Sequence, residues 1–281
     1  IGGGPTGVEL AGAMAEIARR SIPADFRSID TRTARIILVE GGSRVLEAFA
    51  PELSERARRD LERLGVEVRL GKRVTHVDHA GVMIGDERID AECVLWAAGV
   101  QAEPLAATLV VERDRSGRVK VSADLSVPGR PEVFVTGDLA SIVDGRTGQP
   151  VPGVSPAALQ MGRHAARAID AECRAGRAPG AAARPAFRYF DKGLLATIGR
   201  ASAVAQIGGF KFAGLVAWLL WAVVHIFFLI SYRSRLMVMI QWGWEYAVFQ
   251  RGARIITGST DLELSPRPSG NVDQNSRGPQ R

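Results

Sequence analysis

Residues 1–12 read Ile1-Gly2-Gly3-Gly4-Pro5-Thr6-Gly7-Val8-Glu9-Leu10-Ala11-Gly12, and this stretch decides the fold. Gly2, Gly4 and Gly7 fit the pattern G-x-G-x-x-G, and an apolar, Ala-rich helix pattern follows at once. In a dinucleotide-binding fold the first glycine permits a tight strand-to-helix turn, the second lets the backbone approach a pyrophosphate, and the third lets the helix pack closely on the sheet. The N–H groups at the helix N-terminus would bind the phosphates. Taken alone, the motif also fits a glycine-rich turn of an ordinary hairpin.

The composition narrows the classes of protein that fit. The 281 residues are 46% hydrophobic, which allows one large or two ordinary domains with real cores. The formal net charge is +6, but the arginines are scattered, so an anionic membrane surface is a better partner than nucleic acid. Cys93 and Cys173 form no C-x-x-C pair, so a disulfide framework, a zinc site and a dithiol redox centre are unsupported, and no metal is expected.

An acidic residue follows the glycine motif at the end of the next strand. A helix is expected from Val8 to about Arg20, with Leu10, Met14 and Ile17 at helical spacing, and a polar connection over 21–33. The branched apolar run 35–39 predicts a buried parallel strand that ends at Glu40. An acid there accepts hydrogen bonds from an adenosine ribose and repels a 2′-phosphate, so NADH is preferred over NADPH. A solvated carboxylate is the alternative, and the nearby Arg44 leaves some room for NADPH.

The elements that follow alternate between helix and strand. Pro51 opens a second helix that ends at Gly65, a strand covers 66–70, and an antiparallel meander covers 74–77, 82–84 and 88–89. His76 and His79 in the meander are interpreted as solvated rather than metal-binding, because a third ligand is lacking. Further strands are predicted at 93–99, 119–121 and 133–136. Asp138 follows the last of these, where it would bind a sugar or ribityl hydroxyl or cap a helix.

The order of four stretches identifies a resemblance. GGGPTGVELAG (2–12), the strand that ends in Glu40, LWAAGV (95–100) and FVTGDLA (134–140) occur in this order in the two-dinucleotide-domain flavoproteins related to disulfide reductases. FRYFDKG (187–193) and the apolar C-terminal segment narrow the match. Over residues 1–258 the sequence resembles the type II NADH dehydrogenases, which are single-subunit, non-proton-pumping NADH:quinone oxidoreductases, and it is similar to their actinobacterial members.

The resemblance implies an α/β fold with two nucleotide-binding units. Residues 1–98 would form a Rossmann-like NADH-binding domain, and residues 99–185 the returning part of an incomplete FAD-binding domain. Residues 186–258 would form a membrane-apposed anchoring region, and 259–281 a disordered tail rich in Ser, Pro, Arg and Gly. The first half of the FAD domain, with its own glycine loop, would precede Ile1, so we expect an N-terminally truncated chain that binds FAD poorly by itself.

The resemblance also implies roles for individual residues. Glu9 would lie near the nicotinamide–flavin stack, although a first-turn carboxylate favoured by the helix dipole is an equal alternative. Gln160 would contact the quinone–flavin pocket, and Lys192 would lie near the quinone entrance, with a solvated turn lysine as the alternative. Ser155 and Pro156 replace the first Ala-Gln pair of the family pattern, which removes one quinone contact. Residues expected to contact NADH or FAD are Gly2, Gly4, Pro5, Thr6, Gly7, Glu9, Glu40, Ala98, Gly99, Gly137, Asp138 and Ala158.

Two other features near the quinone stretch are given structural interpretations. His164 is expected on the surface of the helix that runs to about Arg174, rather than as a proton donor. Residues 174–184 are rich in Ala, Gly, Pro and Arg and are expected to form a mobile loop.

A long apolar segment near the C-terminus predicts contact with a membrane. Residues 213–230, AGLVAWLLWAVVHIFFLI, contain no Asp, Glu, Lys or Arg. The segment is short for a span, it holds Trp218 and Trp221, and a second amphipathic piece with Arg251 and Arg254 follows. These features favour a monotopic anchor on the cytoplasmic face of the cell membrane over a transmembrane helix. A buried hairpin in a homodimer interface is the alternative.

The predicted activity is a flavin-dependent electron transfer. Hydride would pass from NADH to FAD, and two electrons would then pass to menaquinone or ubiquinone without proton pumping. The alternative from another class is a non-catalytic NADH-binding membrane module, or one part of a split enzyme. A soluble disulfide reductase relative is a weaker option, because the redox cysteine pair is absent and the C-terminal segment is apolar.

Overall fold

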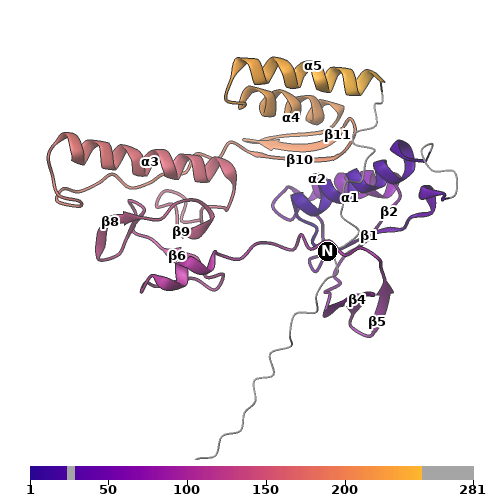
Figure 1. Cartoon of the computed structure of the whole chain (residues 1–281), viewed down its shortest axis with the longest axis horizontal. Helices are drawn as coiled ribbons and strands as arrows, with labels where there is room; N and C mark the ends of the chain where they lie inside the picture. The colour runs from indigo at the N-terminus through magenta and orange to yellow at the C-terminus, as the bar shows by residue number, and fades with distance from the viewer. Residues whose placement is uncertain (24–28, 249–281) are drawn as a thin grey trace, which may run out of the picture.

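The first unit is built around a parallel sheet at the N-terminus. The computed structural model describes residues 1–23 and 29–248 (Figure 1). Strands β1 (Ile36–Val39) and β2 (Val66–Arg69) pair in parallel. Gly2 N donates to Val39 O, and Ala97 N donates to Ile1 O, both at 2.8 Å. The backbone order is therefore 95–97, Ile1, β1, β2, which is the order found around the first strand of a dinucleotide-binding sheet.

Helix α1 (Pro5–Glu16) packs through small residues, which differs from the prediction. It begins at Pro5 and ends in a π-helical turn (Ile17–Ser21). Its buried face consists of Gly7, Val8, Ala11, Gly12 and Ala15. The predicted positions Leu10 and Ile17 are instead 37% and 49% exposed. The backbone of a neighbouring strand comes too close to this face for large side chains to fit.

The second helix and the meander follow the sequence pattern. In α2 (Pro51–Arg63), Leu53, Ala57 and Leu61 are buried as expected, and Gly65 beyond its end has φ +85°. Strands β3 (His76–Asp78), β4 (Gly81–Ile84) and β5 (Glu87–Asp90) form an antiparallel sheet. Apolar residues of β4 and β5 pack against Val39 of β1.

The predicted buried strand at 93–99 is wrong. This segment has no strand assignment, and most of its residues are exposed, Trp96 among them. Its backbone does run beside Ile1, because the Ile1 N-terminus donates to Leu95 O and Ala97 N donates back to Ile1 O. One residue of pairing is too short for a strand.

The second unit is small and carries the longest helix among the described residues. Figure 1 shows α3 (Ser155–Arg174) above a set of short strands, apart from α1 and α2. β6 (Val119–Lys120) pairs in parallel with β9 (Ala140–Ser141), and β7 (Ser126–Val127) pairs antiparallel with β8 (Arg130–Phe134). Short 3₁₀ helices cover Pro104–Thr108 and Gly137–Leu139. The core includes Val119, Leu125, Val127, Met161 and Phe187.

Arg184 fixes the segment that was expected to be a mobile loop. Its side chain is only 5% exposed. It donates to both carboxylate oxygens of Glu172 at 2.7 and 2.9 Å and to Asp124 at 3.1 Å. Gly180 N also donates to Glu172 at 3.0 Å. The segment is therefore held against α3 and β7 by charge-assisted hydrogen bonds.

We expect Arg184→Gln to destabilise the second unit, because it leaves two poorly solvated carboxylates without their shared partner. The hydrogen bonds from Arg184 and Gly180 hold the pKa of Glu172 below its ordinary value of 4.5. Their contribution to stability is present above pH 4.5 and is lost as the pH falls through the lowered pKa. Urea unfolding should show a deficit that is largest at neutral pH and shrinks in acid.

The matched control is Arg174→Gln. Arg174 pairs with Asp170 on the same helix, but its side chain is 80% exposed. This change should alter stability by less than about 0.5 kcal/mol at neutral pH. Equal effects of the two substitutions would contradict the structural role of Arg184.

His164 is not the surface residue that the sequence predicted. Its ring packs edge-on against Phe187, with the ring centroids 5.6 Å apart. Its Nε2 atom is buried and has no hydrogen-bond partner among the described residues. The side chain is therefore part of the contact between α3 and the segment that follows it.

A second sheet covers α1 and α2 on the side away from β1. Strands β10 (Leu194–Gly199), β11 (Ser202–Ile207) and β12 (Phe210–Gly214) are antiparallel. β12 was not predicted, and its last residues overlap the start of the apolar segment. Ala196, Ile198 and Val204 share one hydrophobic core with α1, α2 and β1. Helices α1 and α2 are thus enclosed between two sheets (Figure 1).

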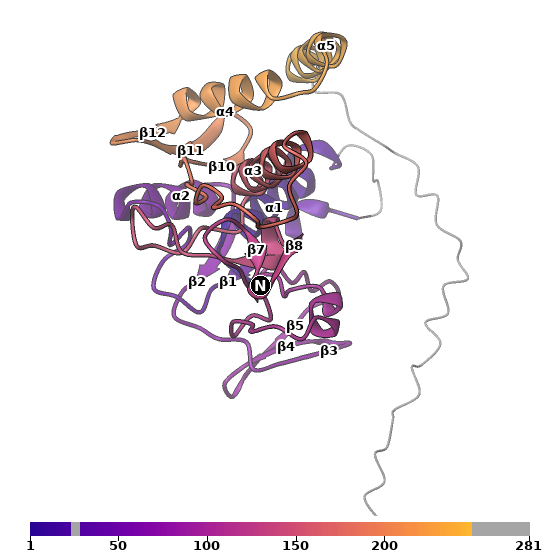
Figure 2. The same ribbon diagram turned by 90° about the vertical axis from the view of Figure 1, so that its left-hand side faces the viewer.

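The apolar C-terminal segment forms a helical pair on the outside of this sheet. Helices α4 (Leu215–Phe227) and α5 (Tyr232–Val248) lie beyond β10–β12 in both views (Figures 1 and 2). Ala217 and Trp218 of α4 pack on β11, and Trp221 stacks on Trp242 of α5 at 5.4 Å. Within residues 1–23 and 29–248, no helix has the length and apolarity that crossing a membrane requires. The predictions for 249–281, including the disordered tail, lie outside the described residues.

The helical pair exposes many large apolar side chains, and we call this set of residues the apolar face. Its large exposed side chains are Leu215, Val216, Leu219, Val223, Phe227, Phe228, Ile230, Leu236, Met237, Met239, Ile240 and Trp244. An exposed patch of this kind is typical of a surface that meets a membrane or another protein.

Candidate functional site

The first and third glycines of the motif fix the shape of the loop. Gly2 has φ +104°, and a Cβ atom on it would lie 2.6 Å from the carbonyl carbon and oxygen of Ala97. A Cβ atom on Gly7 would lie 1.8 Å from Gly2 O. Both contacts are impossible for any other residue without a backbone shift. They confirm the predicted tight turn and close packing.

The second glycine faces open space. Gly4 precedes α1 with φ −70° and ψ −179°, and no heavy atom of the described residues lies within 4 Å of the Cβ position. The first helical hydrogen bond runs from Val8 N to Gly4 O, so Thr6 N and Gly7 N have no helical acceptor. Pro5 and Thr6 are exposed. The loop therefore presents free N–H donors beside a space that a side chain would fill, which fits a bound pyrophosphate.

Glu40 lies directly beside this loop. Its carboxylate accepts hydrogen bonds from Gly3 N at 2.5 Å and from Gly42 N at 2.6 Å. The side chain is half-buried. Arg44 turns away, since its guanidinium donates to Glu47 O at 2.9 Å. The end of β1 therefore presents a carboxylate, rather than a guanidinium, to the motif.

Of the two residues predicted at the cleft, only Ala98 touches the loop. Its Cα lies 2.7 Å from the Cβ position of Gly2. Gly99 has φ +98°, is exposed, and has open space at its own Cβ position.

A second cluster lies where β8 meets the start of α3. Gly137 has φ +70°, its N–H points to Met161 Sδ at 3.2 Å, and its Cβ position is 3.5 Å from Ala158 Cβ. Asp138 is exposed, and its Oδ1 lies 3.4 Å from the Cβ position of Gly153. The alternative that Asp138 caps a helix is wrong, because Val154 and Thr136 occupy the N-cap positions. Within residues 1–23 and 29–248 this carboxylate accepts no hydrogen bond, so it can accept one from a hydroxyl-bearing ligand.

Gln160 connects this cluster to the later FRYFDKG stretch. Its Nε2 donates to Phe190 O at 3.0 Å, and Phe190 N donates to its Oε1 at 2.9 Å. Both ends of the amide are thus occupied by one backbone residue. Lys192, two residues further on, lies with its Nζ 4.4 Å from the centre of the Phe228 ring.

Glu9 is held by the second sheet. It is the fifth residue of α1, so the alternative of a first-turn carboxylate is wrong. Its Oε1 accepts a hydrogen bond from Thr197 N at 3.1 Å. The stretch 190–197 therefore contains Lys192 and contacts both Gln160 and Glu9. Among the described residues, these three side chains do not contact one another.

Sequence reasoning missed the residues that complete these contacts. Phe190, Thr197 and Met161 act through backbone groups or a thioether, which give no signal in the sequence. The resemblance marks the FRYFDKG stretch (187–193), but nothing in its residues indicates a backbone pair with Gln160.

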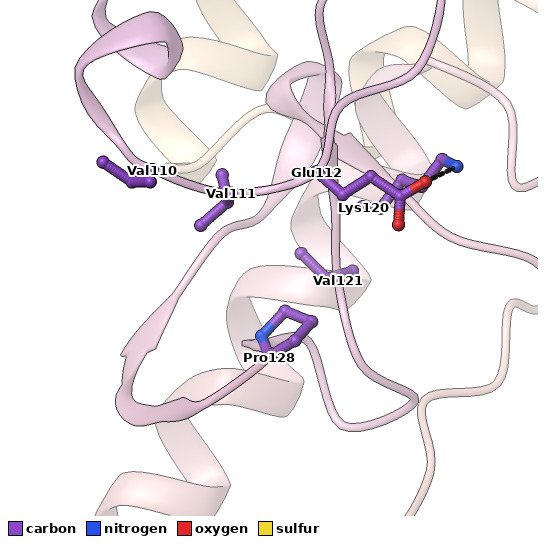
Figure 3. Close-up of a pocket in the computed structure, with 6 residues that line it drawn as sticks. All are labelled: Val110, Val111, Glu112, Lys120, Val121 and Pro128. Carbon is purple, nitrogen blue, oxygen red and sulfur yellow. Dashed lines mark hydrogen bonds and ion pairs between the residues drawn. The ribbon is translucent and has the colours of Figure 1, made fainter.

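The structure also contains a hollow that is separate from the candidate site. It has a volume of about 430 Å³ and lies on the second unit (Figure 3). An ion pair between Glu112 and Lys120 lies on its wall. The residues that line it are Val110, Val111, Glu112, Lys120, Val121 and Pro128. None of the predicted site residues contributes to it. Among the described residues no group of three or more metal-ligating side chains is present.

Two family models match the chain. Residues 1–162 match the family model described as pyridine nucleotide-disulphide oxidoreductase. The chain belongs to this family. Residues 192–251 match a second model, the NDH2 C-terminal domain, which covers β10–β12, α4 and α5.

Two curated relatives come from Mycobacterium tuberculosis. The type II NADH:quinone oxidoreductase Ndh is 42% identical over 266 residues, which are 92% of this chain and 56% of the relative. NdhA, described in the same words, is 43% identical over 267 residues, 92% of this chain and 55% of the relative. The resemblance to type II NADH dehydrogenases, and to actinobacterial members, is thus confirmed. The chain spans about half the length of the curated relatives that it matches.

Solved structures confirm the predicted fold class. NDH2 from Plasmodium falciparum, solved in complex with NADH, superposes with a TM-score of 0.77 at 18% identity, over 89% of this chain and 65% of that one. A FAD-dependent pyridine nucleotide-disulphide oxidoreductase from Desulfovibrio vulgaris gives a TM-score of 0.54 at 23% identity, over 74% of this chain and 47% of that one. The α/β fold is that of the two-dinucleotide-domain flavoproteins.

Proposed function

We propose that the chain forms the NADH-binding part, and a portion of the flavin-binding part, of a type II NADH:quinone oxidoreductase. The observation that supports this most strongly is the open space at Gly4, in a loop that has free helix N–H groups and the Glu40 carboxylate beside Gly3. FAD, when bound, supplies the redox chemistry that moves a hydride equivalent from NADH to a quinone. The 42% identity to a mycobacterial type II NADH:quinone oxidoreductase supports the same assignment.

The residues of the chain would bind and orient the two cofactors. Gly4, Thr6 and Gly7 would hold the NADH pyrophosphate with backbone N–H groups and the positive end of α1. Glu40 would accept hydrogen bonds from the adenosine ribose hydroxyls. To do so, its carboxylate must either give up the hydrogen bond from Gly3 N or accept a second hydrogen bond on the same oxygen. Asp138, with Gly137 and Ala158 beside it, would hold a hydroxyl-bearing part of FAD. We assign residues 1–98 to the NADH-binding unit and 99–185 to the flavin-binding unit, and 190–197 would link both to the quinone side.

The segment 190–197 is where we place the electron exit. Gln160 fixes the backbone of Phe190, Lys192 contacts the helical pair through Phe228, and Glu9 holds Thr197. A quinone that approaches along the apolar face would meet this segment first. We therefore infer positioning roles for Gln160 and Glu9, and contact with quinone or an anionic headgroup for Lys192. Gly99 is the one predicted cleft residue for which the described contacts offer no support.

We also propose peripheral membrane association through the apolar face, with the cytoplasmic side as the site of NADH access. The exposed aromatic and aliphatic side chains of α4 and α5 are suited to the headgroup and acyl boundary. A homodimer interface is the competing way to cover the same face. Menaquinone and ubiquinone both fit this proposal.

The proposal is tested by titrating the chain with NADH and by reading flavin absorbance after purification with added FAD. Micromolar NADH binding is expected, and NADH:menaquinone activity should accompany whatever flavin is retained. Absence of NADH binding by a folded chain would overturn the proposal. NADH binding with no flavin and no activity would favour a binding module that works with another polypeptide.

Glu40→Gln is expected to weaken NADH binding by about tenfold, which corresponds to about 1.4 kcal/mol. The substitution removes the charge that repels a 2′-phosphate. The ratio of NADH affinity to NADPH affinity should therefore fall by a larger factor than the NADH affinity alone. Fluorescence titration with both coenzymes measures this. Glu47→Gln removes an exposed carboxylate nearby and should change neither value. If Glu40→Gln kept the same preference for NADH over NADPH, the proposal that Glu40 binds the adenosine ribose would be wrong.

A further inference from the structure

A hollow of about 280 Å³ lies where the first unit meets the helical pair, away from the glycine motif. Its walls come from the end of α1, from α2, from the β10–β11 turn and from the start of α4. The charged residues that line it are Arg20, Arg56, Arg63 and Arg200, with Glu16 and Asp60. Four guanidinium groups thus face two carboxylates.

Both carboxylates are already used by protein donors. Asp60, whose side chain is 7% exposed, accepts from Arg56 Nε at 3.0 and 2.9 Å, from Arg63 Nη1 at 2.9 Å and from Ser202 Oγ at 2.7 Å. Glu16 accepts from Arg200 N at 2.7 Å. One acid is therefore shared by two arginines, and the hollow keeps an excess of positive charge.

The start of α4 lies beside a guanidinium nitrogen of Arg56 that has no hydrogen-bond acceptor within the part of the chain that the structure describes. Arg56 binds Asp60 through Nε, and its Nη2 lies 3.3 Å from the Cβ position of Gly214. Gly214 is the N-cap residue of α4, with φ +69° and no side-chain cap. The first N–H groups of the helix therefore lack a capping side chain, and the helix dipole adds positive potential there. A tetrahedral oxyanion suits this combination of guanidinium and backbone donors.

The hollow also borders the apolar face. Leu215 lines the hollow, is 55% exposed, and belongs to the apolar face. On another side, Arg200 donates to Glu245 O at 3.1 Å and stacks 4.1 Å from the Tyr246 ring, which ties the hollow to the end of α5. A ligand with a phosphate in the hollow would have its apolar part along α4.

We propose that this hollow binds the phosphate of an anionic phospholipid headgroup, with the acyl chains on the apolar face. The inference rests on the proposed membrane association and specifies its lipid class. A purely apolar face would bind neutral and anionic bilayers alike, whereas an arginine-lined hollow at its edge selects negative headgroups.

The test compares two double variants with the same change in charge. Arg20→Gln with Arg63→Gln removes two exposed arginines of the hollow and leaves Arg56 to pair with Asp60. Arg167→Gln with Arg174→Gln removes two exposed arginines from α3, which lies apart from α4 and α5 (Figure 1). Binding is measured by co-sedimentation with vesicles of phosphatidylcholine alone, or of phosphatidylcholine and phosphatidylglycerol in equal parts.

The hollow variant should lose about 25-fold in affinity for the anionic vesicles, at roughly fivefold for each arginine near the surface. The α3 variant should stay within about twofold of the unchanged chain, because α3 lies apart from α4 and α5 (Figure 1) and salt weakens the attraction between distant charges. Binding to neutral vesicles should be the same for all three. Equal losses in the two variants would overturn the proposal in favour of general charge attraction.

Hydrogen exchange on the unchanged chain gives a second readout that does not depend on a variant. Short-chain phosphatidylglycerol, below its micelle concentration, should slow exchange at 199–202 and 214–217. Equal protection by inorganic phosphate would overturn the lipid assignment and make the hollow a free-phosphate site. NADH titration of the unchanged chain separates the two proposals. If the unchanged chain binds NADH but shows no preference for anionic vesicles, the lipid site alone is rejected. If it prefers anionic vesicles but does not bind NADH, the nucleotide proposal alone is rejected.

Discussion

Gly4→Ala is expected to weaken NADH binding by at least about 100-fold, or about 2.7 kcal/mol. The added methyl group meets no heavy atom of the described residues within 4 Å, so it occupies the space that the pyrophosphate needs. The backbone at Gly4 is extended and tolerates alanine. Folding stability should therefore fall by no more than about 1 kcal/mol, which is the typical cost of alanine in place of a good N-cap residue. Isothermal titration with NADH and urea unfolding measure the two effects.

Gly145→Ala provides the control for this experiment. Gly145 also has open space at its Cβ position and no positive φ, but it lies in the second unit. It should bind NADH as the unchanged chain does. If Gly4→Ala bound NADH normally, the loop would not be the pyrophosphate site, and the proposed function would lose its main support.

Gly12→Ala is expected to destabilise the chain by about 3 kcal/mol, at the upper end of overpacking effects. A Cβ atom at Gly12 would lie 1.6 Å from Ile198 O, so α1 and β10 must separate. That separation would also pull apart the hydrogen bond from Thr197 to Glu9. Chemical unfolding followed by circular dichroism would report the loss.

The matched change is Gly162→Ala, which lies in α3 with nothing within 4 Å of its Cβ position. Here alanine should stabilise the chain by about 0.5–1 kcal/mol, through helix propensity and the unfolded-state entropy. The same substitution should therefore lower the folding stability at Gly12 and raise it at Gly162. A stabilising Gly12→Ala would mean that α1 and β10 are not in the contact described.

Local signals were sufficient for the elements with a clear pattern. Helix α2 was predictable because Pro51 opens it, Leu53, Ala57 and Leu61 repeat at helical spacing, and Gly65 follows its end. β1 was predictable from a run of branched residues, and Glu40 from its position at the end of that run. The glycine motif likewise predicted the turn at Gly2 and the close packing at Gly7, since both depend on missing side chains rather than on a partner.

Non-local contacts account for the errors. Leu10 fits a helical apolar pattern, but the face of α1 that is buried is chosen by β10, which lies about 190 residues later and accepts only small side chains. The 93–99 run has the composition of a buried strand, yet its burial depends on neighbours on both sides. Arg184 lies in a segment with loop-like composition, and its order comes from Glu172 and Asp124.

The candidate site was predictable in its nucleotide half and less so in its quinone half. Glu40 contacts Gly3, the residue before Gly4, as the motif requires. Gln160 was selected by resemblance alone, and its pairing with Phe190 uses a backbone group that no sequence pattern marks. Glu9 was placed near the cofactors, but its hydrogen bond spans 188 residues of sequence.

The sheet β10–β12 has a practical consequence for protein production. A fragment intended only for nucleotide binding could be made by cutting the chain before Leu194, near the start of the match to the NDH2 C-terminal domain at residue 192. Such a cut would remove Ala196, Ile198 and Val204 from the hydrophobic core and expose one side of α1 and α2 to solvent. A cut immediately after Gly214 would remove the apolar helices α4 and α5 and keep the core that β10 and β11 share with α1 and α2.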